Sequence, residues 1–400
     1  MLEYPPVMEV HPRARLLQTE SAFGVLARAR ALERAGREVI HLEIGQPDFP
    51  TPKHICDGAI QAIRDGKTGY GPTPGIPELR EAIAEAAGRE RGISIDPSRV
   101  IVTPGGKPVI FYTVSCLAGP GDEVIYPDPG FPMYASVIAH CGARPVPLLL
   151  REESGFRFDP AELRRLISPR TRLIILNSPQ NPTGGVIDRQ GFETVAAESR
   201  RHGFAVLSDE IYQQFLYDGE FLSPASLEGM QDRTVILDGF SKRYSMTGWR
   251  LGYAIVPEAL REPFELFQVN VVSCAVTFNQ YGALEAIRGS QDCVRAMVAE
   301  FRRRRDYLTA ELRRMPGVRC TTPAGAFYAF PNVAATGLPS TEVAERLLVE
   351  AGVATLAGNS FGPGGDGYLR LSYANSLANL EKAVERMRLF FERLAGSGAG

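Results

Sequence analysis

Short apolar runs alternate with longer amphipathic segments from residue 99 to residue 256. The apolar runs predict strands that are buried on both faces of a sheet. These strands are expected at 100–103, 123–126, 143–149, 173–177, 204–208, 234–237 and 252–256. The amphipathic segments predict helices at about 106–118, 131–140, 159–166 and 188–202. Such alternation is typical of an α/β domain with a mostly parallel, seven-stranded sheet, whose ligands bind at the carboxyl ends of the strands.

The segments on either side of this region predict further elements. Before it we expect helices at 21–36, 53–65 and 76–91 and a strand at 39–44. After it helices dominate to about 315, and later segments include a strand at 368–373 and a helix at about 376–395. We therefore predict a large domain at 48–285 and a smaller α/β domain formed by an N-terminal segment, 1–47, and a C-terminal part, 286–400. The arginine-rich stretch 301–307 is interpreted as the solvated face of a long helix.

Composition narrows the class of function. Hydrophobic residues make up 44% of the chain and charged residues 22%, as in soluble globular proteins, and the net charge of −2 gives no general attraction to nucleic acid or membrane. The N-terminus lacks the pattern of a secretory signal, and no apolar run approaches the ~20 residues of a membrane helix. The six cysteines are scattered and are interpreted as reduced core thiols of a cytoplasmic protein. The five histidines show no metal-ligand spacing, so we expect no metal site.

Residues 238–250 carry the strongest chemical signal. They form a loop between two apolar strands, and the loop holds a lysine, several hydroxyl groups and an arginine. Of the 44 basic residues only five are lysines, and one of them is Lys242 in this loop. A lysine kept in a loop that two buried strands hold in place is a candidate amine nucleophile.

Two other stretches at predicted strand ends have a functional and a structural interpretation. Residues 103–108 place Gly105 and Gly106 at the start of a helix, where backbone N–H groups and the helix dipole favour an anion. A helix entry that needs glycine for its turn is an equally good explanation. In residues 177–184, two X-Pro bonds would hold the amide of Asn181 at the end of a strand, although Asn-Pro also begins ordinary turns.

Three further polar residues follow or interrupt apolar strands. Asp209 ends one strand and is either a helix cap or the partner of a buried cation. Tyr212 lies three residues later, one helical turn away if a helix begins there. Arg370 lies inside a strand near the C-terminus, where it needs an anionic partner unless its stem lies along the surface. Taken together, the glycine-rich anion site, the lysine and these polar residues suggest a phosphorylated cofactor bound as an imine.

The ordered set of motifs resembles the class I, aspartate aminotransferase-like family of fold type I, which uses pyridoxal 5′-phosphate. The resemblance extends over nearly the whole chain. It rests on residues 45–49, 70–80, 105–107, 181–184, 209–212, 241–250 and 370–374. It implies a pyridoxal-phosphate-dependent aminotransferase that moves the α-amino group of an L-amino acid to a 2-oxo acid in two ping-pong half-reactions. It also implies a homodimer whose active site lies at the subunit interface.

The resemblance assigns the catalytic roles to three residues. Lys242 would form the internal aldimine and then carry the proton between Cα and C4′. Asp209 would pair with the pyridinium nitrogen and keep the ring an electron sink. Tyr212, together with Asn181, would hydrogen-bond the phenolic oxygen of the cofactor and so keep the pKa of the imine low.

The remaining roles concern binding. The resemblance implies that the cofactor phosphate is held by Arg250 and the 105–107 backbone, with a tyrosine reaching it from the second subunit. Phe131 would pack on the ring. Arg370 would clamp the substrate α-carboxylate through two hydrogen bonds, helped by the Gly45 backbone and Asn181. The full set of expected cofactor ligands is Tyr70, Gly105, Gly106, Lys107, Phe131, Asn181, Asp209, Tyr212, Ser241, Lys242 and Arg250.

The chain departs from the family pattern at two places. Many relatives have a hydroxyl residue three positions before the lysine, where this chain has Gly239, so that phosphate contact is either absent or supplied by Ser241. Residues 273–279 lack an expected proline near the dimer interface. Substrate choice is weakly encoded: no clear second cation for a distal carboxylate stands out, and Phe23 could border a pocket for an apolar or aromatic side chain.

Two alternative functions remain compatible with these motifs. The same machinery supports β-elimination or decarboxylation, because the bond that breaks depends on which Cα substituent stands perpendicular to the ring. An aminotransferase-like sensing domain of a transcription regulator is the other alternative, but about 20 residues before the first helix cannot contain a DNA-binding module.

Overall fold

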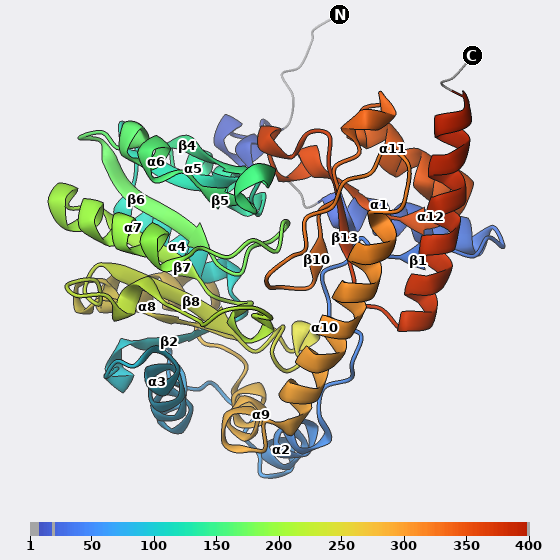
Figure 1. Ribbon diagram of the computed structural model, residues 1–400. Helices are drawn as coiled ribbons and strands as arrows, with labels where there is room; N and C mark the ends of the chain where they lie inside the picture. The colour runs from blue at the N-terminus through green and yellow to red at the C-terminus, as the bar shows by residue number, and fades with distance from the viewer. Residues whose placement is uncertain (1–7, 18–20, 398–400) are drawn as a thin grey trace, which may run out of the picture.

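In the computed structural model, which describes residues 8–17 and 21–397, eight strands form the main sheet (Figure 1). Their order across the sheet is β2-β9-β8-β7-β6-β3-β4-β5. Their bounds are β2 (Val100–Thr103), β3 (Glu123–Asp128), β4 (Arg144–Arg151), β5 (Arg157–Phe158), β6 (Thr171–Asn177), β7 (Ala205–Asp209), β8 (Thr234–Gly239) and β9 (Gly252–Ile255). β9 is antiparallel to both of its neighbours and β5 is antiparallel to β4, while the other strands run in one direction. All seven predicted strands are confirmed, and β5 is an additional strand that we did not predict.

Helices cover both faces of this sheet, which explains why its strands are apolar at nearly every position. Leu173 and Ile175 of β6 point to the face covered by α4, α5 and α8, whereas Ile174 and Leu176 point to the face covered by α6 and α7. The helices in this part of the chain are α2 (Lys53–Arg64), α3 (Pro77–Arg91), α4 (Lys107–Leu117), α5 (Met133–His140), α6 (Pro160–Leu166), α7 (Arg189–His202), α8 (Glu258–Val272) and α9 (Thr277–Arg288).

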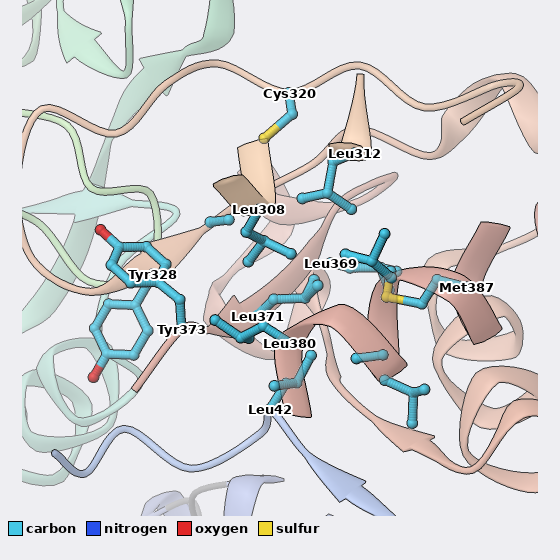
Figure 2. Close-up of a cluster of buried hydrophobic side chains, with 14 of the residues drawn as sticks. Leu42, Leu308, Leu312, Cys320, Tyr328, Leu369, Leu371, Tyr373, Leu380 and Met387 are labelled. Carbon is cyan, nitrogen blue, oxygen red and sulfur yellow. The ribbon is translucent and has the colours of Figure 1, made fainter. Parts of the chain in front are cut away.

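The two ends of the chain meet in a second core (Figures 1 and 2). Leu42, from the N-terminal segment, packs with Leu308, Leu371 and Met387 from C-terminal elements. The elements here are α1 (Ser21–Arg34), β1 (Ile40–His41), α10 (Asp292–Leu312), β10 (Tyr328–Ala329), α11 (Ser340–Arg346), β11 (Val353–Ala354), β12 (Leu356–Ala357), β13 (Leu369–Ser372) and α12 (Leu377–Ser397). β1 pairs with β11, and β13 pairs with β10 and β12. This arrangement confirms an α/β fold in which the N- and C-terminal parts combine; the domain boundaries at 47/48 and 285/286 stay a prediction.

Short helical segments complete the chain between these elements. The 3₁₀ segments are Pro12–Leu16, Pro97–Arg99, Glu152–Ser154, Gln213–Phe215, Pro224–Ser226, Thr247–Trp249, Ala334–Thr336, Gly358–Phe361 and Pro363–Gly365, and a π-helical turn spans Leu347–Ala351. Several begin with proline, which presets the backbone for a helical turn. Within residues 8–17 and 21–397, no helix has both the length and the apolar character needed to cross a lipid bilayer.

Two expectations about side-chain exposure need correction. Arg302 and Arg303 are exposed on α10 as expected, but Arg304 and Arg305 are buried and form ion pairs with Asp48 and Asp218. The arginine run is therefore only half a solvated face. The six cysteines are free thiols, but within the described part of the chain only Cys320 is fully buried, so most of them lie at the edge of the core.

Candidate active site

The carboxyl ends of the parallel strands bring the predicted polar residues to one edge of the main sheet. Asn177 ends β6, Asp209 ends β7 and Gly239 ends β8, and these strands are direct neighbours in register. The loop after β8 carries Lys242 before the chain returns along β9. The strand-end placement predicted from the sequence is therefore confirmed.

Lys242 points toward the N-terminal segment. Its half-buried Nζ donates a hydrogen bond of 2.5 Å to the carbonyl oxygen of Gly45 and lies 6.0 Å from the ring centroids of Tyr212 and Phe327. Gly45 is closely packed, because a Cβ there would overlap the hydroxyl group of Tyr328. The lysine amine therefore lies where the N-terminal segment, the main sheet and the C-terminal elements meet.

Asp209 is a buried carboxylate at the centre of this edge. Its Oδ2 accepts a hydrogen bond of 2.7 Å from the hydroxyl of Tyr134, and its Oδ1 accepts from the backbone N–H of Ile211 at 3.3 Å. Burial raises the pKa of Asp209 to about 6, against the lowering effect of these two hydrogen bonds. A carboxylate held in this way is suited to pair with a cation that enters the site.

Tyr212 does not follow Asp209 along a helix, as the three-residue spacing had suggested. The chain leaves β7 through a turn and enters the 3₁₀ segment Gln213–Phe215. The buried hydroxyl group of Tyr212 shares a hydrogen bond of 2.7 Å with the hydroxyl of Tyr328. Burial raises the pKa of the Tyr212 phenol, so it is a neutral hydrogen-bonding group at physiological pH.

Gly105, Gly106 and Arg250 lie together at the N-terminus of α4. Gly105 has φ +87°, and a Cβ there would overlap the guanidinium group of Arg250. Arg250 itself adopts a left-handed conformation with φ +54° and donates a hydrogen bond of 3.0 Å to the carbonyl of Thr247. Backbone N–H groups at a helix start next to a guanidinium group make an anion site, so the structure favours this interpretation over a simple helix entry.

Arg370 is buried, which rules out a stem lying along the surface. Its Nη1 donates to Oδ1 of Asn181 at 3.1 Å, and its Nη2 donates to the carbonyl oxygen of Glu43. Its guanidinium carbon lies 4.6 Å from the ring centroid of Tyr328. The main chain of Asn181 is fixed in turn, because its N–H donates to Oδ1 of Asn177 at 2.9 Å.

The structure brings some of the remaining predicted residues together and leaves one apart. Lys107 Nζ lies 5.9 Å from the ring centroid of Phe131. Ser241 is buried next to Lys242. Tyr70, in contrast, is 93% exposed, so this single chain covers little of its side chain. The roles of all these residues stay predictions.

Two tyrosines in the site were not predicted. Tyr134 binds Asp209, and it lies three residues after Phe131, so a search for a buried aromatic hydroxyl near a strand end could have found it. Tyr328 contacts Gly45, Tyr212 and Arg370, but it lies in the two-residue strand β10, and no local pattern in the sequence marks it.

Comparison with known proteins agrees with this geometry. The family model for aminotransferases of class I and II matches residues 37–387. The chain is 41% identical to an aspartate aminotransferase of Pyrococcus abyssi, over 88% of this chain and 91% of that protein. It is also 41% identical to an aromatic-amino-acid aminotransferase of Thermococcus litoralis, over 87% of this chain and 90% of that protein. A crystal structure of the aspartate aminotransferase from Rhizobium meliloti superposes with a TM-score of 0.92 at 35% identity, over 96% of this chain and 99% of that chain.

These matches cover nearly the whole chain and include both cores and the strand-end site. They confirm the fold type and the transaminase activity expected from the motifs, in preference to a non-catalytic sensing domain. Members of this family generally depend on pyridoxal phosphate. The protein belongs to the class I and II aminotransferase family and is a transaminase of fold type I.

Proposed function

We propose that the chain binds pyridoxal 5′-phosphate at the edge of the main sheet and transfers the α-amino group of an L-amino acid to a 2-oxo acid. Lys242, Asp209 and Tyr212 are the proposed catalytic residues. Asn181 and Arg370, with the Gly45 backbone, are the proposed substrate ligands. The other proposed cofactor ligands are Gly105, Gly106, Lys107, Phe131, Ser241, Arg250 and, from a second subunit, Tyr70.

One observation carries this proposal. The amine of Lys242 contacts Gly45, Gly45 packs against Tyr328, and the ring of Tyr328 lies over the guanidinium group of Arg370. Gly45 and Tyr328, which contact each other, thus lie between two functional groups. One is an amine that can form an imine, and the other is a buried guanidinium group that can bind a carboxylate. An α-amino acid carries the amino and carboxylate groups that these two side chains recognise.

The phosphate of the cofactor fits the site formed by Gly105, Gly106 and Arg250. The departure at Gly239 has a steric explanation, because a Cβ there would lie 2.8 Å from Cα of Gly252, where β8 packs against β9. A side chain at residue 239 would need the two strands to separate. We therefore assign the hydroxyl contact with the phosphate to Ser241, which is buried next to the lysine.

Phe131 and Asp209 would hold the ring of the cofactor. Burial raises the pKa of Asp209 to about 6, and a protonated ring nitrogen beside it would stabilise the ionised carboxylate. When bound, pyridoxal phosphate supplies a carbonyl that condenses with amines and a ring that accepts the electrons released at Cα. Lys242 would move the proton at Cα, Asp209 would hold the proton on the ring nitrogen, and Arg370 would orient the carboxylate.

The proposed substrates are an L-amino acid and a 2-oxo acid, and two relatives are named for different amino acids. The Pyrococcus abyssi relative is named for aspartate and the Thermococcus litoralis relative for aromatic amino acids. Phe23, near the start of α1, remains the candidate border of an apolar pocket and is largely exposed in this chain. Equal rates with aspartate and phenylalanine would contradict that assignment.

A homodimer is the second part of the proposal. Exposed apolar residues gather at the end of α8 and just after it: Leu266, Val269, Val271, Val272 and Val276. Thr277, next to them, donates a hydrogen bond of 2.8 Å to the carbonyl of Gly69, so the loop that carries Tyr70 lies beside this patch. A second copy of the chain on this surface would bury the patch and receive Tyr70.

A cytoplasmic location is proposed from cysteine usage. The six cysteines are free thiols, which suits a reducing compartment. Activity that requires an added reductant after air oxidation, and that survives in reducing buffer, would agree with this location.

The test of the activity is an absorption spectrum combined with chemical trapping. The purified protein should show a visible band with bound cofactor, and a panel of L-amino acids should change that band. Lys242→Ala should not respond. Borohydride reduction followed by peptide mapping should place the cofactor on Lys242 and not on Lys107, the other lysine near the site. A protein that takes up no pyridoxal phosphate would overturn the proposal.

A further inference from the structure

A glycine-rich segment of the C-terminal part lies against the carboxyl end of β3. The N–H of Gly364 donates a hydrogen bond of 3.0 Å to Oδ1 of Asp128, the last residue of β3. Two residues further along, the N–H of Gly130 donates to the carbonyl of Phe361 at 2.7 Å. These two hydrogen bonds, which we call the Asp128 clasp, join the main sheet to the C-terminal elements.

The glycines of this segment pack closely against Asp128. Gly362 has φ +117°, and a Cβ there would overlap the carboxylate of Asp128. A Cβ at Gly364 would lie 3.0 Å from both the carbonyl oxygen and Oδ1 of Asp128. Asp128 is buried, and burial raises the pKa of its carboxyl group. Burial of a carboxyl group costs folding free energy, so a buried carboxyl group that a loop packs closely against is a candidate for a functional role.

The Asp128 clasp is connected to the proposed substrate site through Phe361. Phe361 carries the carbonyl that Gly130 binds, and its ring centroid lies 4.9 Å from the guanidinium carbon of Arg370. Together with Tyr328, on which Arg370 also packs, Phe361 places aromatic rings against this guanidinium group. On the other side, Gly130 is followed by Phe131, the residue proposed to pack on the cofactor ring.

We infer that Asp128 is a positioning residue for the substrate carboxylate: by holding the 361–364 segment through the clasp, it keeps Phe361 against Arg370 and so fixes the direction of the guanidinium fork. The inference rests on the proposed role of Arg370. Bidentate binding of a carboxylate depends on that direction, so a loose Phe361 lowers carboxylate affinity without removing any group that touches the cofactor.

The test uses the holoenzyme with two substitutions at Asp128. Asp128→Ala removes the acceptor of the Gly364 hydrogen bond, whereas Asp128→Asn keeps an oxygen in the same place. We expect Asp128→Ala to bind a carboxylic acid that lacks an amino group about tenfold more weakly, measured by its displacement of the visible absorption band. Asp128→Asn should stay within about twofold of the unmodified protein.

A second readout separates positioning from general damage. A primary amine without a carboxylate enters the same half-reaction but does not use Arg370. Its single-turnover rate and the cofactor content should therefore be unchanged in Asp128→Ala. An equal loss for the amine and the amino acid would overturn the inference.

A variant on the opposite side of the clasp covers the case in which Asp128→Ala does not fold. Gly364→Ala should push the segment away from Asp128 and reproduce the loss of carboxylate affinity. Gly119→Ala is the matched control, because among the described residues an added Cβ there meets no atom within 4 Å. Unchanged carboxylate affinity in Gly364→Ala would overturn the inference.

Arg370→Gln distinguishes the two levels of the argument. If this variant binds the carboxylic acid as well as the unmodified protein does, the proposed role of Arg370 fails, and the inference fails with it. If Arg370→Gln loses affinity while Asp128→Ala and Gly364→Ala do not, only the inference on Asp128 fails.

Discussion

At the scale of single residues, the charge on Asp209 is set by opposing effects. Burial raises its pKa to about 6, and the negative charges of Asp238 and Glu210 add to this. The Tyr134 hydroxyl and the Ile211 N–H stabilise the carboxylate and lower the pKa. In the cofactor-free chain the ionised form therefore dominates only above about pH 6, and below that pH the site loses the charge that we expect to hold a cationic ring nitrogen.

Substitution Tyr134→Phe tests this balance. The raised pKa of Asp209 means that cofactor binding should weaken as pH falls through about 6. Loss of the Tyr134 hydrogen bond raises the pKa further, so the weakening should begin about one pH unit higher. Cofactor dissociation constants from pH 5 to 8 measure the shift. Asp209→Asn should abolish this pH dependence, and Tyr112→Phe, a buried tyrosine bonded to Gln268, should leave it unchanged.

At the scale of elements, the cofactor site depends on how closely three segments pack. A Cβ at Gly252 of β9 would lie 2.8 Å from the carbonyl carbon of Gly105 and 2.9 Å from the N of Gly106. On the other side of β9, Gly239 of β8 packs on Cα of Gly252. The glycines let the phosphate loop, β9 and the start of the Lys242 loop approach one another, which fixes the spacing between the proposed phosphate site and the lysine.

We expect Gly239→Ser to destabilise the protein. The added Cβ would meet backbone atoms that cannot move without separating β8 from β9, at a cost of about 2 kcal/mol. Gly248→Ser, in the same loop, meets no atom within 4 Å among the described residues and should change stability by less than about 0.5 kcal/mol. Chemical unfolding of both cofactor-free variants gives the comparison; equal stability would contradict the steric account of Gly239.

The length of an element decided whether the sequence could predict it. Runs such as 173–177 are buried on both faces, so composition alone marks them, and β6 was predicted to within two residues. β5, β10, β11 and β12 have two residues each, which is too short to show an apolar or alternating pattern, and each is defined by its pairing with another strand. The same holds for Tyr212: its helical spacing from Asp209 was misleading because the contact with Tyr328 is made across the fold.

At the scale of the whole molecule, α10 joins the two cores (Figure 1). Arg304 on this helix forms ion pairs with Asp48 at 2.7 Å and with Glu300 at 2.8 Å, and it lies over the rings of Phe49 and Phe301. Asp48 and Phe49 belong to the segment that follows Gly45. The buried arginine therefore ties the helix to the segment whose carbonyl binds Lys242.

Arg304→Met should be costly, and Arg303→Met should not. The first removes the Arg304 ion pair from the partly buried carboxylate of Asp48 and leaves Glu300 with its exposed partner Arg303, which we expect to cost about 3 kcal/mol of unfolding free energy. Arg303 is exposed on the same helix, and within the described residues it forms an ion pair with Glu300 only. Its loss should therefore cost less than about 0.5 kcal/mol. Urea unfolding of the two variants measures the difference. Equal effects would show that burial does not decide how much each arginine of residues 301–307 contributes to stability.

The site could be predicted from the sequence as a set of residues but not as a set of contacts. Lys242, Asp209, Asn181 and Arg370 follow from strand ends and motif order. Their partners come from segments that are distant in sequence, as in the pairing of Asn181 with Arg370 across 189 positions. No pattern within either segment specifies that distance, because it is set by the packing of the two cores.

The exposed Tyr70 makes a prediction about the assembly. If Tyr70 reaches the phosphate site of a second subunit, Tyr70→Ala and Lys242→Ala damage different sites when they meet in one dimer. The site with the intact lysine receives Tyr70 from the Lys242→Ala subunit, whereas the other site lacks both groups. Two impaired variants, denatured together and refolded as a mixture, should therefore recover about a quarter of the unmodified activity, since half of the dimers would be mixed and each would have one complete site. Refolding each variant separately is the control. Absence of recovery in a mixture that sedimentation shows to be dimeric would mean that Tyr70 serves its own subunit, or no site, and the exposed apolar end of α8 would then need another explanation.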